Sequence, residues 1–302
     1  MTWLQSRLRP LRDIPETAEQ LRKANSKDKK EYSFGHSAAA TATHAARTVH
    51  SDAAFLLPYL KPTDKILDVG CGPGTITYGF AEHVPDGSVT GTDYAPVVVE
   101  KAQAFALSKI HEDDGKSRGK LEFIVGNVLE KLPFEDETFD LVFSSHVLTH
   151  LGSQCSQALK EMRRVLKTGG ILSSRDGCTM LYQPLQQELG VQFWGNLCKA
   201  AGIDGFIGPK MAALYRGVGF DVDGGKVKVG GGSNVQFGRD ATRAHAESMA
   251  GRLNKGDTFR ANWEKAGISE EEIDFCQKAM LQWGETEDAW YGILQSEIVA
   301  WK

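Results

Sequence analysis

The sequence predicts an α/β protein whose sheet is mostly parallel and carries helices on both faces. Short apolar runs alternate with longer segments of helical spacing, which is typical of parallel strands connected by helices. The first apolar run, residues 65–69, ends in a turn with three closely spaced glycines. The second run, residues 89–93, ends in an acid about 20 residues after those glycines, the spacing that suits a ribose-binding acid.

The elements of this core follow in order along the chain. Each predicted strand is short and apolar, and the segments between strands are long enough for crossover helices. The predicted strands are residues 65–69, 89–93, 121–126, 139–144 and 170–174. The predicted helices of the core are residues 75–84, 96–110 and 153–167.

The segment before the first strand is predicted to be helical. Residues 37–60 are rich in alanine and contain no glycine, which favours helix. Ser51 and Asp52 can break or cap this segment, so we expect two helices, and Pro62 ends them. Residues 1–30 are polar and basic, and we expect a flexible N-terminal arm there.

The alternating pattern becomes looser after Arg175. The glycine-rich run at 230–233 is too short for a linker, and we interpret it as a turn. The elements expected in this part are helices at 184–217 with an interruption at 202–208, a strand at 220–232 with a turn at Gly224 and Gly225, two or three amphipathic helices at 240–283, and a closing strand at 290–301.

The glycine turn indicates a nucleoside site. Glycine at positions 70, 72 and 74 lets the chain turn sharply and lets a ligand approach the backbone. A dinucleotide would need N–H groups aimed at its pyrophosphate, but Pro73 has no N–H, and Thr75 stands where the third glycine of the dinucleotide pattern belongs. A nucleoside without phosphates fits better, and S-adenosylmethionine is the obvious candidate. A plain strand-to-helix turn is the alternative without a ligand.

Three segments resemble a known family. Residues 66–74 resemble the first motif of class I S-adenosylmethionine-dependent methyltransferases. Residues 132–151 resemble their middle segment, and residues 158–170 resemble the helix and turn before their fifth strand. Together these segments resemble the ubiquinone/menaquinone-biosynthesis type of small-molecule methyltransferase, and the resemblance is densest over residues 53–175.

The resemblance implies a Rossmann-like methyltransferase fold with a seven-stranded, mostly parallel sheet whose last two strands form an antiparallel pair at one edge. It divides the methyltransferase domain, residues 31–302, into three parts. These are a helical lid at 31–64, a cofactor-binding core at 65–178, and a substrate-side half at 179–302 with a helical insertion at 240–283.

The resemblance also assigns roles to single residues. It implies that Asp93 binds both ribose hydroxyls, and that the carbonyls of Ser144 and Ser145 face the positive end of the cofactor. Asp68 resembles the acid near the cofactor's ammonium group, with an acid that caps the backbone of the turn as an equal alternative. Asn127 stands where the family usually has aspartate, and it could instead be a turn residue. The cofactor-binding candidates are Tyr32, Asp68, Gly70, Cys71, Gly72, Gly74, Asp93, Tyr94, Asn127, Val128, Ser144 and Ser145.

The candidate for catalysis is His36. Together with Tyr32 and Phe34 it precedes the alanine-rich segment that should fold over the cofactor. An aromatic face attracts a sulfonium, and a histidine near the methyl group could remove a proton from the acceptor. The alternative is that these residues anchor the arm to the core. His146 and His150 are four residues apart, but no third ligand is evident, so we expect no metal.

Arg47 and the aromatic residues of the last third each have two interpretations. Arg47 either pairs with a carboxylate or is a plain surface arginine. The aromatic residues either line an apolar acceptor pocket or pack in the core. They are Phe193, Trp194, Trp263, Trp283, Trp290 and Tyr291.

Composition narrows the class of protein. The 302 residues are 41% hydrophobic and 25% charged, which is typical of a globular domain, and the net charge of -4 gives no basic footprint for nucleic acid. No stretch approaches the length of an uninterrupted membrane helix. The five cysteines are scattered, which predicts free thiols in a reducing compartment, so we expect a cytoplasmic protein.

These features predict an enzyme that moves a methyl group from S-adenosylmethionine to a small acceptor, apolar or aromatic, and leaves S-adenosylhomocysteine. A non-catalytic S-adenosylmethionine-binding regulator is the alternative from another class, and turnover would separate the two. A nicotinamide-dependent oxidoreductase is disfavoured by Pro73 and Thr75. The oligomeric state is left open.

Overall fold

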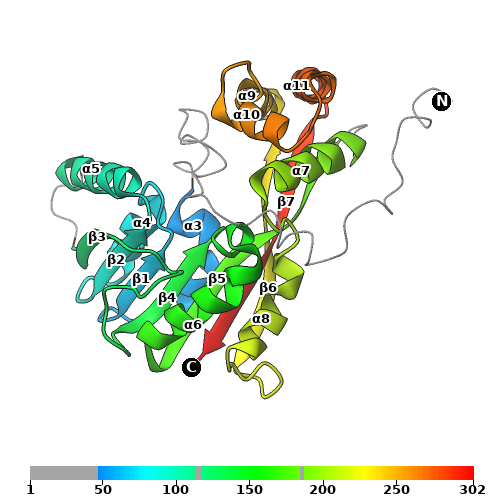
Figure 1. Cartoon of the computed structure of the whole chain (residues 1–302). Coiled ribbons are helices and arrows are strands. Elements are labelled where there is room, and N and C mark those ends of the chain that lie inside the picture. The colour runs from blue at the N-terminus through cyan, green and yellow to red at the C-terminus, as the bar shows by residue number, and fades with distance from the viewer. Residues whose placement is uncertain (1–46, 113–116, 184–186) are drawn as a thin grey trace. The chain divides into compact units, whose positions relative to one another are not determined.

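The computed structural model describes residues 47–112, 117–183 and 187–302, which belong to one compact unit. Their strands form a seven-stranded sheet in the order β3-β2-β1-β4-β5-β7-β6 (Figure 1). Strands β1 to β5 run parallel, and β7 runs antiparallel to β5 and β6. The strands are β1 Lys65–Val69, β2 Ser88–Asp93, β3 Lys120–Val125, β4 Phe139–Ser145, β5 Leu166–Gln183, β6 Val227–Phe237 and β7 Trp290–Trp301.

The helices fall into two groups, those that flank the parallel strands and those that follow β5. The α-helices are α3 Val49–Asp52, α4 Thr75–His83, α5 Pro96–Glu112, α6 Cys155–Val165, α7 Gln187–Ala201, α8 Met211–Gly217, α9 Arg239–Gly251, α10 Thr258–Lys265 and α11 Glu270–Gly284. Short 3-10 helices cover Ala54–Tyr59, Leu148–His150, Gly152–Gln154 and Gly208–Lys210.

Both faces of the parallel strands are covered, which explains why β1 is apolar along most of its length. Ile66 belongs to a core cluster that includes Phe80 of α4. The next residue, Leu67, points to the opposite face and belongs to a cluster with Met162 of α6 and Tyr215 of α8. The sheet is therefore the middle layer of three.

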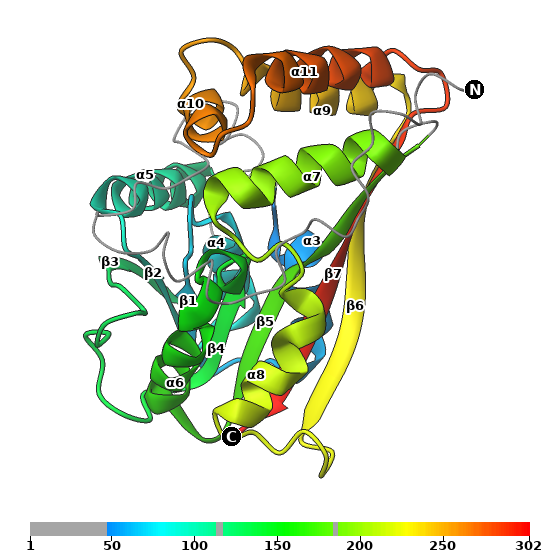
Figure 2. The ribbon, with the colours of Figure 1, turned by 45° about the vertical axis from the view of Figure 1, so that its right-hand side comes forward.

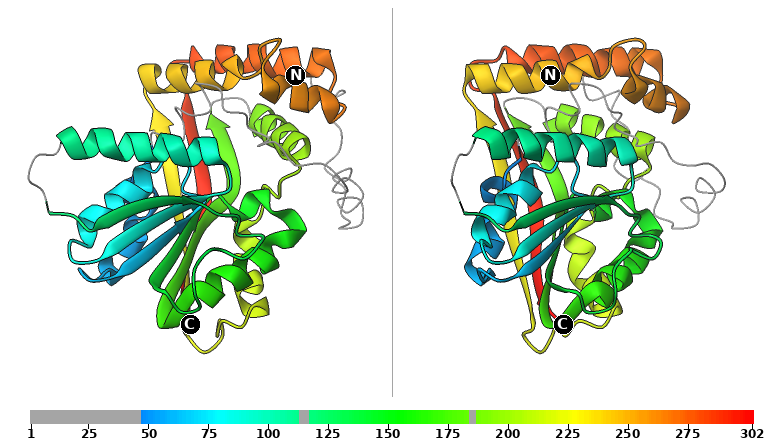
Figure 3. Two further views of the ribbon diagram at one scale, coloured as in Figure 1. Left: turned by 60° about the vertical axis from the view of Figure 1, so that its left-hand side comes forward. Right: turned by 90° about the vertical axis from the view of Figure 1, so that its left-hand side faces the viewer.

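A third core lies where β5 and β7 extend past the other parallel strands. Tyr182 of β5 and Tyr291 of β7 are paired in register and pack with helices α7, α9, α10 and α11. Trp263 and Trp283 are almost completely buried in this cluster. In Figures 2 and 3, α9, α10 and α11 lie together, apart from the helices that flank the parallel strands. We call α7 and α9–α11 the upper helices.

Most predicted elements are confirmed. The predicted strand at 290–301 is β7, and the predicted core helices correspond to α4, α5 and α6 within a few residues. The region 240–283 holds α9, α10 and α11, and these helices are inserted between the antiparallel strands β6 and β7. Strand β6 forms the sheet edge, as expected.

The glycine run at 230–233 is not a turn, so that prediction was wrong. Gly230 and Ser233 lie inside β6, opposite Glu297 and Leu294 of β7, and the predicted strand at 220–232 is shifted to Val227–Phe237. A Cβ atom on Gly232 would collide with the Glu297 carboxylate, so the small residue makes room for that side chain. The turn predicted at Gly224 is confirmed.

The predicted strand at 170–174 is much longer than expected. Strand β5 continues to Gln183, because β7 pairs with it along its length. The register shifts between Gly177 and Thr179, which marks a bulge.

The predicted helical lid is described only from Arg47. Thr48 and Ser51 form a capping box at the start of α3, so Ser51 caps a helix, and this helix ends at Asp52. The chain leaves the helical conformation at Ala53, and the second helix is a 3-10 helix that contains Pro58. The expected arm at 1–30 and the predicted residues Tyr32, Phe34 and His36 lie outside the described residues.

No helix in the described part of the chain combines the length and apolar character that crossing a bilayer requires.

The core of the upper helices can be tested with Trp263→Ala. Trp263 is fully buried between Phe193 of α7 and Phe259 of α10, with ring centroids 5.3 and 5.6 Å away. Emptying this volume should lower the free energy of unfolding by about 3–5 kcal/mol in urea titrations followed by circular dichroism. Phe275→Ala on α11 is the control, because that ring is exposed and its loss should change little. Equal effects of the two changes would contradict the assigned core.

Candidate functional site

The glycine turn is tied to the end of the neighbouring strand. Gly70, Gly72 and Gly74 have φ angles of 70°, 54° and 81°, a left-handed region that favours glycine. The N–H groups of Gly70 and Cys71 both donate to the carbonyl of Thr92 in β2, at 2.8 and 3.0 Å. The turn is therefore fixed at the carboxyl ends of β1 and β2, where parallel sheets bind ligands.

The three glycines face different surroundings. A Cβ atom on Gly70 would collide with Val147, and one on Gly74 would lie 2.8 Å from Phe123 and 3.0 Å from Ala102. At Gly72 no atom lies within 4 Å of the place that a Cβ would take. Gly70 and Gly74 thus allow close packing of the protein, whereas Gly72 borders open space that a ligand could fill.

Asp93 lies directly beside this open space. Its Oδ2 accepts the N–H of Gly72 at 3.3 Å, and its Oδ1 accepts the N–H of Ala95 at 3.1 Å. These bonds hold the carboxylate in place at the end of β2. Tyr94, the next residue, is about half exposed, and burial raises the pKa of its hydroxyl, as does the charge of Asp93.

Asp68 is a buried acid below the turn. It is 3% exposed, and its Oδ2 accepts a hydrogen bond from the hydroxyl of Thr77 in α4 at 2.6 Å. Burial raises the pKa of its carboxyl to about 7, against the lowering effect of the Thr77 bond. The interpretation that Asp68 caps the backbone of the turn is wrong, because its partner is this side chain. Thr77 was not predicted from sequence, since a threonine inside a helix carries no such signal.

The end of β4 faces both a core and the turn. The hydroxyl of Ser144 is buried 3.0 Å from that of Ser174 in β5, so its side chain belongs to the α8 side of the sheet. The hydroxyl of Ser145 is buried, and it makes no hydrogen bond to any described residue. An orphaned polar atom at this edge fits a ligand with a polar group.

Asn127 is a turn residue, as the alternative interpretation predicted. Its Oδ1 accepts the N–H of Leu129 at 3.0 Å, and its Nδ2 donates to Glu130 at 3.2 Å. Val128 is buried in the core cluster around Leu67, and Cys71 is buried near Tyr78. Burial raises the pKa of the Cys71 thiol. That Asn127 and Val128 bind the cofactor stays a prediction.

His146 takes a left-handed backbone conformation, with φ of 55°, that is uncommon for residues other than glycine. Its N–H donates to the carbonyl of Arg175 at 2.8 Å, and its Nε2 lies 2.5 Å from Nε2 of Gln295. His146 therefore does not share a helical turn with His150, although their spacing of four residues would allow one. No group of three or more His, Cys, Asp or Glu residues in the described part of the chain could hold a metal ion.

Arg175 and Asp176 were missed as site residues, although two charged residues directly after the predicted strand at 170–174 could have revealed them. Asp176 is fully buried, and its Oδ1 accepts the N–H of Thr149 at 3.0 Å. Burial raises the pKa of its carboxyl to about 7. Arg175 is 3% exposed and bonds to Gln295.

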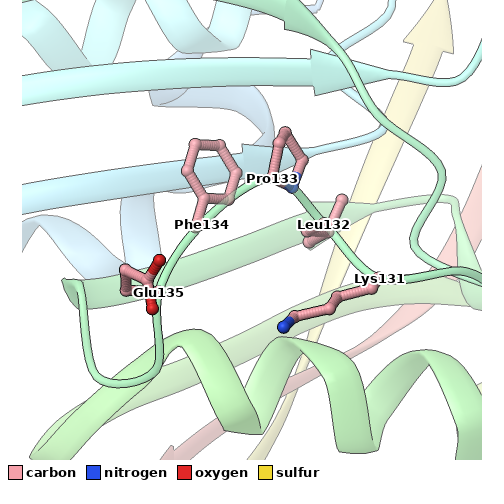
Figure 4. Close-up of a pocket in the computed structure, with 5 residues that line it drawn as sticks. All are labelled: Lys131, Leu132, Pro133, Phe134 and Glu135. Carbon is pink, nitrogen blue, oxygen red and sulfur yellow. The ribbon is translucent and has the colours of Figure 1, made fainter.

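A separate hollow lies on the connection between β3 and β4 (Figure 4). It is lined by Lys131, Leu132, Pro133, Phe134 and Glu135. Arg164 ties this connection to α6, with bonds of 2.9 Å to the carbonyl of Phe134 and 2.7 Å to Asp136. Since this anchor adjoins the amino end of β4, the hollow lies away from the glycine turn and contributes nothing to that site.

Phe193, Trp263 and Trp283 are buried core residues, so the packing interpretation is correct for them. Tyr291 also belongs to this core, and its ring stacks on His245 of α9 at 4.1 Å. Trp290 is only partly buried, and the side chain of Trp194 lies outside the described residues.

Comparison with known proteins supplies independent information. A family model for a methyltransferase domain matches residues 60–201. A protein of Aspergillus luteorubrus named probable methyltransferase ltbC is 41% identical over 278 residues, which cover 90% of this chain and 97% of that protein. The demethylmenaquinone methyltransferase of Lysinibacillus sphaericus is 37% identical over 114 residues, which cover 37% of this chain and 44% of that enzyme.

A solved structure from Bacillus halodurans shares the fold. Its TM-score is 0.53 at 17% identity, and the match covers 83% of this chain and 98% of that one.

The different surroundings of Gly72 and Gly74 give a test of the turn. Alanine at either position adopts a strained left-handed backbone, which costs about 1–2 kcal/mol. Gly74→Ala should cost about 1–3 kcal/mol more than Gly72→Ala, because only its methyl group meets Phe123 and Ala102. Urea unfolding of both variants measures the difference. Equal stabilities would show that the space at Gly72 is not open in the free protein.

Proposed function

We propose that this chain, which belongs to the S-adenosylmethionine-dependent methyltransferases, transfers a methyl group to a small acceptor that is apolar or aromatic, and releases S-adenosylhomocysteine. The observation that carries the proposal is the open space over Gly72 with the Asp93 carboxylate fixed beside it. An open space beside a fixed carboxylate supports a nucleoside site in which Asp93 binds the ribose diol.

The residues of the turn fit each part of the methyl donor. We assign the ribose hydroxyls to Asp93, because its carboxylate lies beside the open space over Gly72. The buried carboxyl of Asp68 suits the ammonium group, since a positive charge would offset the cost of ionising a buried acid. The orphaned hydroxyl of Ser145 suits the polar amino acid end. Tyr94, partly exposed beside Asp93, suits the adenine side.

Catalysis on this site consists mainly of alignment. When bound, the methyl donor supplies an electrophilic carbon on a sulfonium, and displacement there requires a nucleophile held in line. The chain contributes strand ends whose positions are fixed by sheet pairing, and these ends hold the groups that contact the ligands. His36 remains our candidate for removing an acceptor proton, and it lies among the residues that the structure does not describe.

An aromatic acceptor is supported by the relative from Lysinibacillus sphaericus, whose name states that it methylates demethylmenaquinone. The buried aromatic residues of the upper helices give no support, because they form that layer's core. Release of S-adenosylhomocysteine from S-adenosylmethionine with a small-molecule extract tests catalysis directly. Binding without any turnover would instead favour a regulatory protein.

The role of Asp93 can be tested with Asp93→Ala. Loss of charge-assisted bonds to the ribose should weaken S-adenosylhomocysteine binding by about 1.5–3 kcal/mol in calorimetry. Asp223→Ala is the control, since that carboxylate is exposed and pairs only with Arg216 on the surface. Unchanged affinity in Asp93→Ala would remove this residue from the site, and NADH should not bind either protein.

The pKa of Asp68 predicts a pH dependence with a definite sign. Its folded-state pKa lies above the ordinary value of 3.8, so the protonated form stabilises the free protein at low pH, and this stabilisation is lost as pH rises through about 7. Binding of S-adenosylhomocysteine should strengthen over the same range, because ionised Asp68 attracts the ammonium group. Asp68→Asn should lack both trends. A wild-type affinity that is flat between pH 5.5 and 7.5, a range of about two units around that pKa, would contradict the assignment.

A further inference from the structure

A polar cluster adjoins the glycine turn on the side of β4 and β5. Val147 contacts the turn at Gly70, and its neighbour His146 bonds to Gln295 of β7. Gln295 in turn accepts a hydrogen bond from Nε of Arg175 at 2.8 Å. A chain of direct contacts therefore leads from the turn into a group of charged residues above the carboxyl ends of the strands.

Arg175 in this cluster is fully engaged. Besides Gln295, it donates to Asn234 at 2.8 Å and to the backbone carbonyl of Ser51, and Glu297 lies 3.6 Å from its Nε. Burial lowers the pKa of its guanidinium, although the charge of Glu297 acts in the opposite direction. Such an arginine is a structural anchor that holds β5, β7 and the start of α3 together.

Arg47 lies next to this anchor, and the contact of its guanidinium is a long ion pair. Its side chain is only 23% exposed, yet it donates no hydrogen bond to any described residue, and its one ion pair is a 4.0 Å approach to Oδ1 of Asp52. That oxygen is itself fully buried and accepts no hydrogen bond from the described residues. A guanidinium has five N–H donors in a planar fork that suits an oxygen anion. Arg47 thus has unused donors in a largely enclosed place.

The groups around Arg47 include residues of two neighbouring strands, β5 and β7. Burial raises the pKa of the Asp176 carboxyl in β5 and that of the Tyr291 hydroxyl in β7, and the positive charge of Arg47 acts against this rise at both groups. Both groups are therefore within the electrostatic reach of Arg47. The Oδ2 of Asp176 is buried without a hydrogen-bond donor among the described residues. Asp52 and Glu297 are the other acids here, and Glu297 is balanced by Arg175.

We propose that Arg47 binds an anionic oxygen of the acceptor, so that the methylated molecule is a small organic acid. The inference rests on the methyltransferase function proposed above and adds the acceptor's chemical class. The guanidinium would hold the acid by charge-assisted hydrogen bonds and thereby orient its nucleophilic atom toward the methyl donor. The anion would also accept hydrogen bonds from the N–H groups of Arg47 that donate to no described residue.

The experiment uses the full-length protein saturated with S-adenosylhomocysteine and measures binding of three small probes by calorimetry. Benzoate offers a carboxylate, 4-nitrophenol at alkaline pH offers a phenolate, and benzamide is the neutral control. We expect at least one anion to bind about tenfold more tightly than benzamide, and the preference to disappear in Arg47→Gln and to survive partly in Arg47→Lys. Arg243→Gln is the matched control, because its exposed guanidinium pairs only with Glu285 on the surface.

Two outcomes would overturn the proposal. One is a wild-type protein that binds neither anion more tightly than benzamide, and the other is an Arg47→Gln variant that keeps the anion preference. Affinity for S-adenosylhomocysteine, measured on each preparation, separates this result from a failure of the proposed function. A wild-type protein that does not bind S-adenosylhomocysteine would refute the methyl-donor site. A wild-type protein that binds it but shows no preference for anions would refute only the role of Arg47. Thermal melting of each variant confirms that it is folded.

Discussion

The site depends on the parallel register of β1 and β2. Because Val69 is paired with Thr92, the carbonyl of Thr92 lies where the N–H groups of Gly70 and Cys71 can reach it. The same register places Asp93 beside the turn, within 3.3 Å of the N–H of Gly72. A slip of one residue would send the Asp93 side chain to the other side of the sheet, so one strand pairing determines both the turn and its acid.

The long antiparallel pair of β5 and β7 supplies the other half of the architecture. It runs from the pairing of Ile171 with Trp301 to that of Gln183 with Trp290, so it extends beyond the parallel core and carries the upper helices. The same two strands provide Arg175 and Gln295, which are bonded across the pair. The polar cluster is therefore built on strands whose positions are fixed by packing, and such elements hold functional groups more precisely than loops do.

The sequence predicts those parts of the fold that depend on local pattern. Strand β1 and strand β7 have the predicted bounds, since each is a compact apolar run between turn signals. Strand β6 was misplaced because three consecutive glycines normally indicate a turn, whereas here they pair with residues 295–297 of β7, and Gly232 makes room for the side chain of Glu297. The length of β5 was missed for a similar reason. Arg175 interrupts its apolar pattern, and the partner that makes this arginine acceptable, Gln295, is 120 residues away.

In the candidate site, too, the sequence predicts what depends on local spacing and misses what depends on contacts between distant segments. The proximity of Asp93 to the turn follows from a spacing in the sequence, and the structure places the two in contact. The bond between Asp68 and Thr77 needs the relative position of a strand and a helix, which no local pattern supplies. The left-handed backbone of His146 could not be predicted either, because glycine and a few polar residues are the types that indicate that conformation in a sequence.

Charged residues lie on both sides of the carboxyl edge of the sheet. Asp68 and Asp93 lie on the side of β1 and β2, whereas Arg47 and Arg175 lie on the side of β5 and β7. Acids accompany both arginines, since Glu297 lies 3.6 Å from Arg175 and Asp52 lies 4.0 Å from Arg47. A cationic methyl donor is attracted to the acids of β1 and β2. On the other side, an anionic acceptor would gain the hydrogen bonds that the guanidinium of Arg47 does not donate to described residues, and this difference in the groups on offer would order the two ligands along the edge.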